Sequence, residues 1–146
     1  MTNRAKKISS IDRKANNRNE RPVTEEMPLM LFSFKDFQHN DQIPPGQTYA
    51  EWQEIKRLSY MLEKFGHICN VNRIEAIQKK FIKVYGNFPS NSKFRNPFPD
   101  SELEWAVVMS IGGQKSRVAG YIIDHIFYVV FLDAEHKFYP SELKNT

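Results

Sequence analysis

Cysteine is almost absent from this sequence of 146 residues, in which Cys69 stands alone. A lone cysteine excludes an internal disulfide framework and a zinc site built from cysteines, and it favours a reducing, cytoplasmic setting. Long apolar runs are also missing, since no stretch approaches the roughly 20 residues that a membrane-spanning helix needs. The N-terminal segment is basic but has no apolar stretch, so it lacks the form of a secretory signal. We therefore expect a cytoplasmic protein with no membrane partner.

Several common catalytic signatures are missing as well. The sequence has no GxxxxGK phosphate loop, no dinucleotide-binding GxGxxG and no GxSxG nucleophile elbow. Its four histidines show none of the short spacings typical of metal ligands. We expect neither a metal site nor a cofactor.

Positive charge is present but unevenly distributed. The net charge is +4, yet residues 1–21 alone contain seven lysines and arginines against two acidic residues. Such a composition is typical of a solvated tail, or of an arm that gains phosphate contacts through counterion release. We predict that residues 1–26 form a basic flexible leader and that residues 27–146 form a single α+β domain.

The predicted domain begins with a strand and a helix. Residues 28–37 are rich in Phe, Leu and Met, which favours a strand. The sequence TYAE (48–51) has the form of a capping box, in which the first and fourth residues each bind the other's backbone amide. Apolar residues then recur at helical spacing from Trp52 to Phe65, and Gly66 is the expected end of this helix.

A second helix and a long connection follow. The sequence NRIE (72–75) repeats the capping pattern, and the apolar residues after it predict a helix that ends at Gly86. Segment 86–102 is rich in Pro, Asn and Ser, so we expect it to be an irregular connection.

Three strands are predicted in the remainder of the domain, over residues 103–111, 116–124 and 126–133. The third is apolar on both faces, which places it inside a covered sheet or against a partner. The order of strand, two helices and three strands predicts an α+β fold, with the helices packed on one face of a mostly antiparallel sheet.

The residues around this C-terminal hairpin suggest acid–base chemistry on RNA. Cleavage of RNA without a metal needs a base for the 2′-hydroxyl, a cation for the charged phosphorane and an acid for the leaving oxygen. His136 titrates in the range needed for either proton role, Arg117 has a forked donor set suited to phosphate, and Tyr139 can donate a proton. These three are the predicted catalytic residues. The alternative for Arg117 is a surface cation near the start of a strand. The alternative for His136 and Tyr139 is packing in a turn and at the edge of the core.

Further residues are predicted to contact RNA. Phe94 has a basic residue on each side and is expected to stack on a base, while charged side chains near it and near the hairpin would hold phosphates. The predicted RNA-binding residues are Lys93, Phe94, Arg95, Lys115 and Lys137. Phe94 has an alternative role, in which Phe88, Phe94 and Phe98 fix the connection to the core.

The order of elements and the C-terminal sequence resemble the RelE/ParE toxin superfamily. The similarity covers residues 28–140 and lies in LMLFSFKDF (29–37), the two capped helices and KSRVAGYIIDHIFYVVFLDAEHKFY (115–139). Many members of that superfamily cleave mRNA on the ribosome, and the ParE branch poisons gyrase. The resemblance implies a phosphate-binding role for Arg117 and an acid–base role for His136 or Tyr139.

Three functions remain open from the sequence. The first is a toxin-like endoribonuclease or translation inhibitor that acts on RNA or ribosome-bound mRNA and has a cognate antitoxin or other protein partner. The second is a non-enzymatic binding module, such as an antitoxin, immunity or regulatory protein, that uses the C-terminal hairpin as a protein interface. The third is a gyrase-directed inhibitor without nuclease chemistry. The second requires an open apolar face on residues 126–133, which is a property of the structure.

Overall fold

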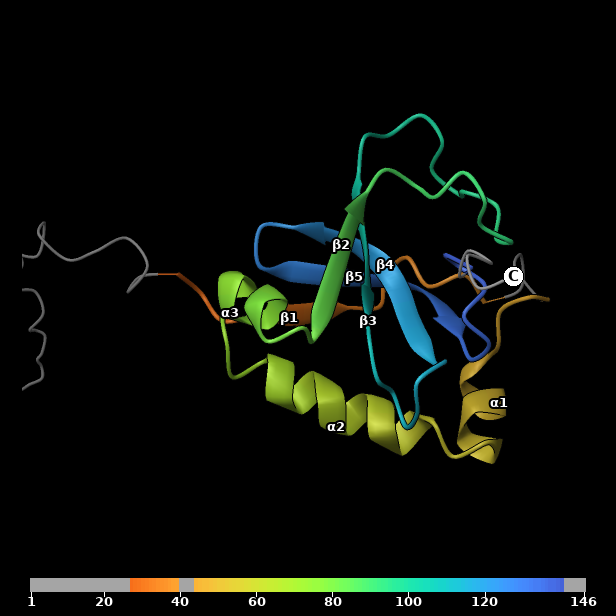
Figure 1. Cartoon of the computed structure of the whole chain (residues 1–146), viewed down its shortest axis with the longest axis horizontal. Coiled ribbons are helices and arrows are strands. Elements are labelled where there is room, and N and C mark those ends of the chain that lie inside the picture. Colours follow the sequence, from red (N-terminus) through yellow and green to blue (C-terminus); the bar gives the residue numbers. More distant parts are fainter. Residues whose placement is uncertain (1–26, 40–43, 141–146) are drawn as a thin grey trace, which may run out of the picture.

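The computed structural model describes residues 27–39 and 44–140, and Figure 1 labels its helices and strands. The elements in chain order are β1 (Leu31–Ser33), α1 (Tyr49–Glu54), α2 (Leu58–Ile68), α3 (Arg73–Gln78), β2 (Ile82–Gly86), β3 (Glu104–Val108), β4 (Arg117–Ile123) and β5 (Ile126–Asp133). The predicted leader, residues 1–26, lies outside the described residues. Among the helices described, none has the length and apolarity required to cross a membrane.

The strands form one five-stranded sheet in the order β1-β5-β4-β3-β2. β1 runs parallel to β5, and the other three neighbouring pairs are antiparallel. The parallel pair is possible because the helices and the rest of the chain separate its two strands, as parallel pairing requires. The predicted α+β class, with helices packed on a mostly antiparallel sheet, is confirmed. The predicted strand count is wrong, since four strands rather than three follow the helices.

Both predicted capping boxes are present, but the first helix is not continuous. The Thr48 side chain accepts from the amide of Glu51, whose carboxylate accepts from the amide of Thr48. The chain then adopts a left-handed conformation at Lys56 (φ 64°), which separates α1 from α2. Gly66 lies within α2 rather than at the end of a helix. The break lets Trp52 of α1 become fully buried while α2 takes its own direction along the sheet.

The second predicted helix is also shorter than expected. Its capping box at Asn72 and Glu75 is present, but α3 ends at Gln78. A left-handed residue, Lys80 (φ 64°), then turns the chain into β2, which pairs with β3. Residues 82–86 therefore form an edge strand because pairing with β3 satisfies their backbone groups better than an isolated last helical turn.

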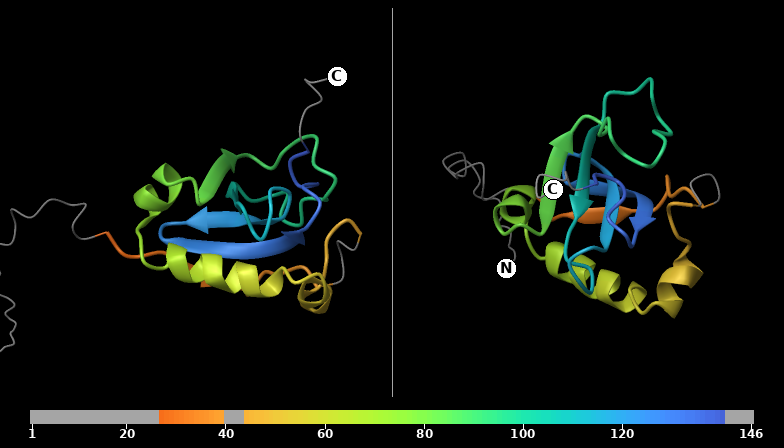
Figure 2. Two further views of the ribbon diagram at one scale, coloured as in Figure 1. Left: turned by 60° about the horizontal axis from the view of Figure 1, so that its bottom comes forward. Right: turned by 45° about the vertical axis from the view of Figure 1, so that its right-hand side comes forward.

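Two apolar cores cover the two faces of the sheet. On one face, Met61, Phe65 and Ile68 of α2 join the apolar residues of the strands in one cluster. On the other face, the aromatic residues of the connection between β2 and β3, together with Phe138, cover Trp105 and Phe131. Figures 1 and 2 show α2 along one side of the sheet and the connection between β2 and β3 on the other. Within residues 27–39 and 44–140, no helix covers the second face, which is the face that carries Arg117 and Tyr85.

Candidate functional site

The site is built on the turn that follows β5, and Asp133 fixes that turn. Asp133 is fully buried, and its two carboxylate oxygens accept from the backbone amides of Lys137 and Phe138, each at 2.8 Å. Burial raises the pKa of this carboxyl group, while the two amides and the charges of Arg117 and Lys137 act in the opposite direction. The carboxylate thus serves as a structural acceptor that holds residues 134–138 against the sheet.

Arg117 begins β4 directly opposite Asp133 of β5. One of its terminal nitrogens, Nη1, donates to the backbone carbonyls of Gln114 and Ser116. Its Nε is buried and has no hydrogen-bond partner among the described residues. A buried donor without an acceptor is unusual in a folded protein and is often found where a ligand is expected. The backbone thus holds the guanidinium through Nη1, while the Nε–H group has no acceptor among the described residues.

His136 lies in the turn after β5 in a left-handed conformation (φ 62°). The pKa of its imidazole is lowered, chiefly because partial burial disfavours the charged form, and the positive charges of Arg117, Lys83 and Lys115 lower it further. A lowered pKa keeps the imidazole neutral at neutral pH, which is the state that accepts a proton.

Two tyrosines complete the cluster. The rings of Tyr85 in β2 and Tyr139 stack with their centroids 4.4 Å apart. Burial raises the pKa of Tyr85, although the charge of Arg117 acts to lower it, while Tyr139 and Asp133 raise it further. The Tyr85 phenol therefore keeps its proton at neutral pH and can act as a donor. Tyr139 is 38% exposed, so a ligand can reach the stacked pair from solvent.

The three predicted catalytic residues lie in one neighbourhood of the structure, but among the described residues no hydrogen bond, ion pair or ring contact joins any two of them. Tyr85 stacks on Tyr139, and the positive charge of Arg117 acts to lower the pKa of Tyr85. The same charge lowers the pKa of His136. The cluster therefore joins β2, β4 and the turn after β5, which are far apart in the sequence.

Lysines surround this cluster at the surface. Lys83 lies with its Nζ 5.5 Å from the centre of the Tyr85 ring. Lys115 and Lys137 are exposed, and Lys115 forms a 3.2 Å ion pair with Glu135. The amide of Lys93 donates to the carbonyl of Lys137 at 3.0 Å, so the connection between β2 and β3 is tied to the turn that holds His136. Three predicted RNA-binding lysines thus lie around the predicted catalytic residues.

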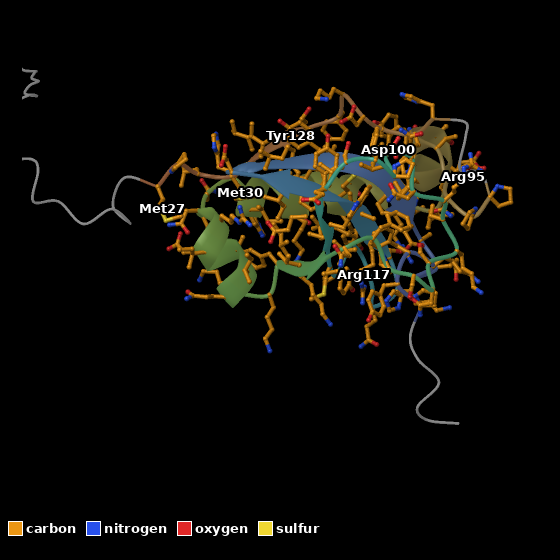
Figure 3. All side chains as sticks on the ribbon, turned by 90° about the horizontal axis from the view of Figure 1, so that it is seen from above. Met27, Met30, Arg95, Asp100, Arg117 and Tyr128 are labelled. Carbon is orange, nitrogen blue, oxygen red and sulfur yellow. The ribbon has the colours of Figure 1, made fainter. Side chains whose placement is uncertain are left out.

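Phe94 and Arg95 do not join the site. Phe94 is 5% exposed and stacks on Phe131 with ring centroids 4.4 Å apart. A base cannot stack on a ring that is already packed in the core, so the prediction that Phe94 contacts RNA is wrong and its alternative, structural role is correct. Figure 3 shows Arg95 toward one end of the molecule and Arg117 nearer its middle. Arg95 is therefore separated from the cluster.

The second face of β5 is not an open interface. Phe127, Val129 and Phe131 are at most 1% exposed, and Val130 and Leu132 on the same strand are fully buried. Phe127, Val129 and Leu132 belong to the core on the helix side, while Val130 and Phe131 belong to the core under the aromatic connection. Ile126 and Tyr128 of β5 are half-buried and Ile123 of β4 is 47% exposed, so within the described residues the apolar surface left open on the hairpin lies near its tip.

Sequence reasoning missed three residues of this cluster. Tyr85 and Lys83 fall within the predicted second helix, but the structure places both in β2. The role of Asp133 as the acceptor that holds the turn is not predicted from the sequence. The available signal was the alternation in Ile82-Lys83-Val84-Tyr85, which has the period of a strand as well as an approximate helical match. Among the described residues, no group of three or more His, Cys, Asp or Glu side chains is placed to hold a metal ion.

Comparison with known proteins leaves the geometry as the main guide. No family model matches the chain, and neither a curated protein nor a solved structure matches it. The resemblance to the RelE/ParE superfamily remains a prediction.

Proposed function

We propose that this protein is a toxin-like endoribonuclease that cleaves mRNA by acid–base chemistry of its own side chains. The observation that supports the proposal is the stacking of Tyr139 on Tyr85, with ring centroids 4.4 Å apart, near Arg117, whose charge acts on Tyr85 and on His136. These groups include an imidazole whose lowered pKa keeps it neutral, a fixed cation with an unsatisfied buried donor, and the Tyr85 phenol, whose raised pKa keeps its proton in place. Together they match the base, the charge stabiliser and the acid that RNA cleavage requires.

The reaction assigns one role to each group. Neutral His136 accepts the proton of the 2′-hydroxyl, and the 2′-oxygen attacks the adjacent phosphorus. Arg117 stabilises the negative charge that develops on the phosphorane oxygens. The bond from phosphorus to the 5′-oxygen then breaks, and a tyrosine hydroxyl of the stacked pair donates a proton to that oxygen. The products are a 2′,3′-cyclic phosphate and a 5′-hydroxyl end.

The proposal extends to where the protein acts. The lysines near the cluster would supply phosphate contacts: Lys83 lies over the Tyr85 ring, the backbones of Lys93 and Lys137 are hydrogen-bonded, and Lys115 pairs with Glu135 at the surface. The substrate would be free or ribosome-bound mRNA in the cytoplasm. A cell that makes such an enzyme needs to restrain it, so a cognate antitoxin is the expected protein partner.

The test combines purified protein with a defined single-stranded RNA. The wild type should produce fragments that end in 2′,3′-cyclic phosphate, and Arg117→Ala should lower kcat by about 10²–10³, as the loss of a transition-state donor commonly does. His136→Asn should abolish the cleavage while tolerating the left-handed backbone at that position. Lys56→Gln, which removes an exposed lysine at another left-handed position, is the control.

Expression in cells provides an independent readout. The wild type should arrest growth and cleave transcripts, and Arg117→Ala or His136→Asn should relieve both effects. Intact RNA with the wild-type protein, in both assays, would overturn the proposal. Cleavage that persists in both variants would show that the catalytic groups lie elsewhere.

A further inference from the structure

A groove with an apolar floor and basic walls lies between α3 and the edge strand β2. Its volume is about 580 Å³, and it is lined by Arg73, Ile77, Lys80, Ile82, Lys83, Val84, Glu104 and Met109. Figure 1 shows α3 beside β2 at the outer side of the sheet. This volume lies within the range of about 300–1,000 Å³ that is typical of ligand-binding pockets.

The charges of the groove favour an anionic occupant. Arg73 forms an ion pair with Glu104, the one acidic residue in the lining, which neutralises that carboxylate. Lys80 and Lys83 are both exposed and add two positive charges. Ile77 is 37% exposed, so part of the floor is an apolar surface open to solvent. Basic walls over an apolar floor suit a nucleic acid strand, whose phosphates bind the cations while its bases cover the apolar surface.

Lys83 links the groove with the catalytic cluster across the edge strand β2, because Ile82 and Val84 of the groove pack on the helix side of the sheet and Tyr85 packs on the other side. Lys83 lines the groove, and its Nζ lies 5.5 Å from the centre of the Tyr85 ring, which stacks on Tyr139. A strand that crosses β2 at Lys83 would have one phosphate beside the tyrosines and its neighbouring nucleotides between α3 and β2.

We propose that this groove binds the single-stranded part of the RNA substrate next to the scissile phosphate. The inference rests on the proposed function, but it concerns binding rather than chemistry. It predicts that affinity grows with RNA length until the groove is filled, and that the growth depends on Lys80 and Ile77. It also predicts that each groove lysine contributes one phosphate contact, which adds about 0.7 to the slope of log Kd against log salt for a single strand.

The experiment measures binding of fluorescent 2′-O-methyl RNA, which lacks the attacking hydroxyl and cannot be cleaved. A dodecanucleotide and a trinucleotide are titrated with wild-type protein and three variants. Lys80→Gln should reduce the affinity advantage of the longer RNA and lower its salt slope by about 0.7. Ile77→Glu should remove most of that advantage, because it places an anion in the floor. Lys56→Gln, at another exposed left-handed lysine, should keep the wild-type ratio.

The outcomes separate this inference from the proposed function. Equal length dependence and equal salt slopes in Lys80→Gln and Lys56→Gln would overturn the groove assignment, even if the wild type cleaves RNA. Displacement of the dodecanucleotide by a polyglutamate peptide at equal charge concentration would also overturn it, because the groove would then suit an acidic protein segment. Dependence on Lys80 and Ile77 in a protein that cleaves no RNA would support the groove and refute only the proposed chemistry.

Discussion

Replacement of Asp133 by alanine tests how the turn that carries His136 is held. Asp133 supplies the acceptors for the amides of Lys137 and Phe138, each at 2.8 Å. Phe138 is fully buried, so its amide would lose its acceptor without gaining water, at a cost of about 1–3 kcal/mol. Lys137 is exposed, and its amide would be partly rehydrated. We therefore expect Asp133→Ala to lower the free energy of unfolding by about 2–4 kcal/mol.

The asparagine variant tests the same hydrogen bonds without changing the size of the side chain. Asp133→Asn keeps one acceptor oxygen and the size of the side chain, but its amide group faces a backbone donor, so it should cost roughly half as much as alanine. Urea titration followed by the fluorescence of Trp52 and Trp105, both buried, gives the midpoint and slope. A loss below about 1 kcal/mol for Asp133→Ala would refute the argument, because it would mean that the two amides need no buried acceptor.

Three further predictions concern pH and packing. Because the pKa of His136 is lowered in the folded protein, the neutral imidazole contributes fully to stability above pH 6.5. This contribution is lost as the pH falls through the folded-state pKa. His136→Asn should therefore flatten the acid side of the pH–stability curve relative to the wild type. Lys83→Gln removes a charge that lowers this pKa, so the acid limb of the pH–rate profile for RNA cleavage should move to higher pH; an unchanged limb would argue against His136 as the base. Gly120→Ala would bring its Cβ to 1.9 Å from the carbonyl oxygen of Tyr128, and overpacking of this kind lowers the free energy of unfolding by about 1–3 kcal/mol or more, measured by urea titration. Gly66→Ala within α2, where a Cβ meets no atom within 4 Å, should instead raise the free energy of unfolding by about 0.5–1 kcal/mol.

The helix starts could be predicted from the sequence because they are encoded locally. Each capping box needs two side chains three residues apart, and both pairs, at Thr48 and Asn72, form as predicted. The helix ends depend on distant parts of the chain. Neither Lys56 nor Lys80 is a glycine or a proline, yet both adopt φ 64°, because the turns they make allow Trp52 to be buried and β2 to pair with β3. Local propensity does not contain that information.

The candidate site shows the same division. Arg117, His136 and Tyr139 could be proposed from their chemistry, since few other residues near the hairpin can bind phosphate or exchange a proton near neutral pH. Tyr85 could not, because its position depends on the pairing of β2 with β3. The basic neighbours of Phe94 suggest a contact with RNA. A large aromatic ring stabilises the fold more when it is buried than when it is exposed, and here Phe94 packs on Phe131.

The arrangement of the two faces explains why the site lies where it does. The helices bury most of one face of the sheet. The other face is covered by a connection and a turn, whose cover ends at Tyr85 and Tyr139, where the sheet reaches its edge strand. Asp133 fixes the turn from beneath, so His136 is positioned by a buried carboxylate that does not itself face the ligand. Arg117 lies opposite Asp133 at the start of β4, and its buried Nε has no acceptor among the described residues.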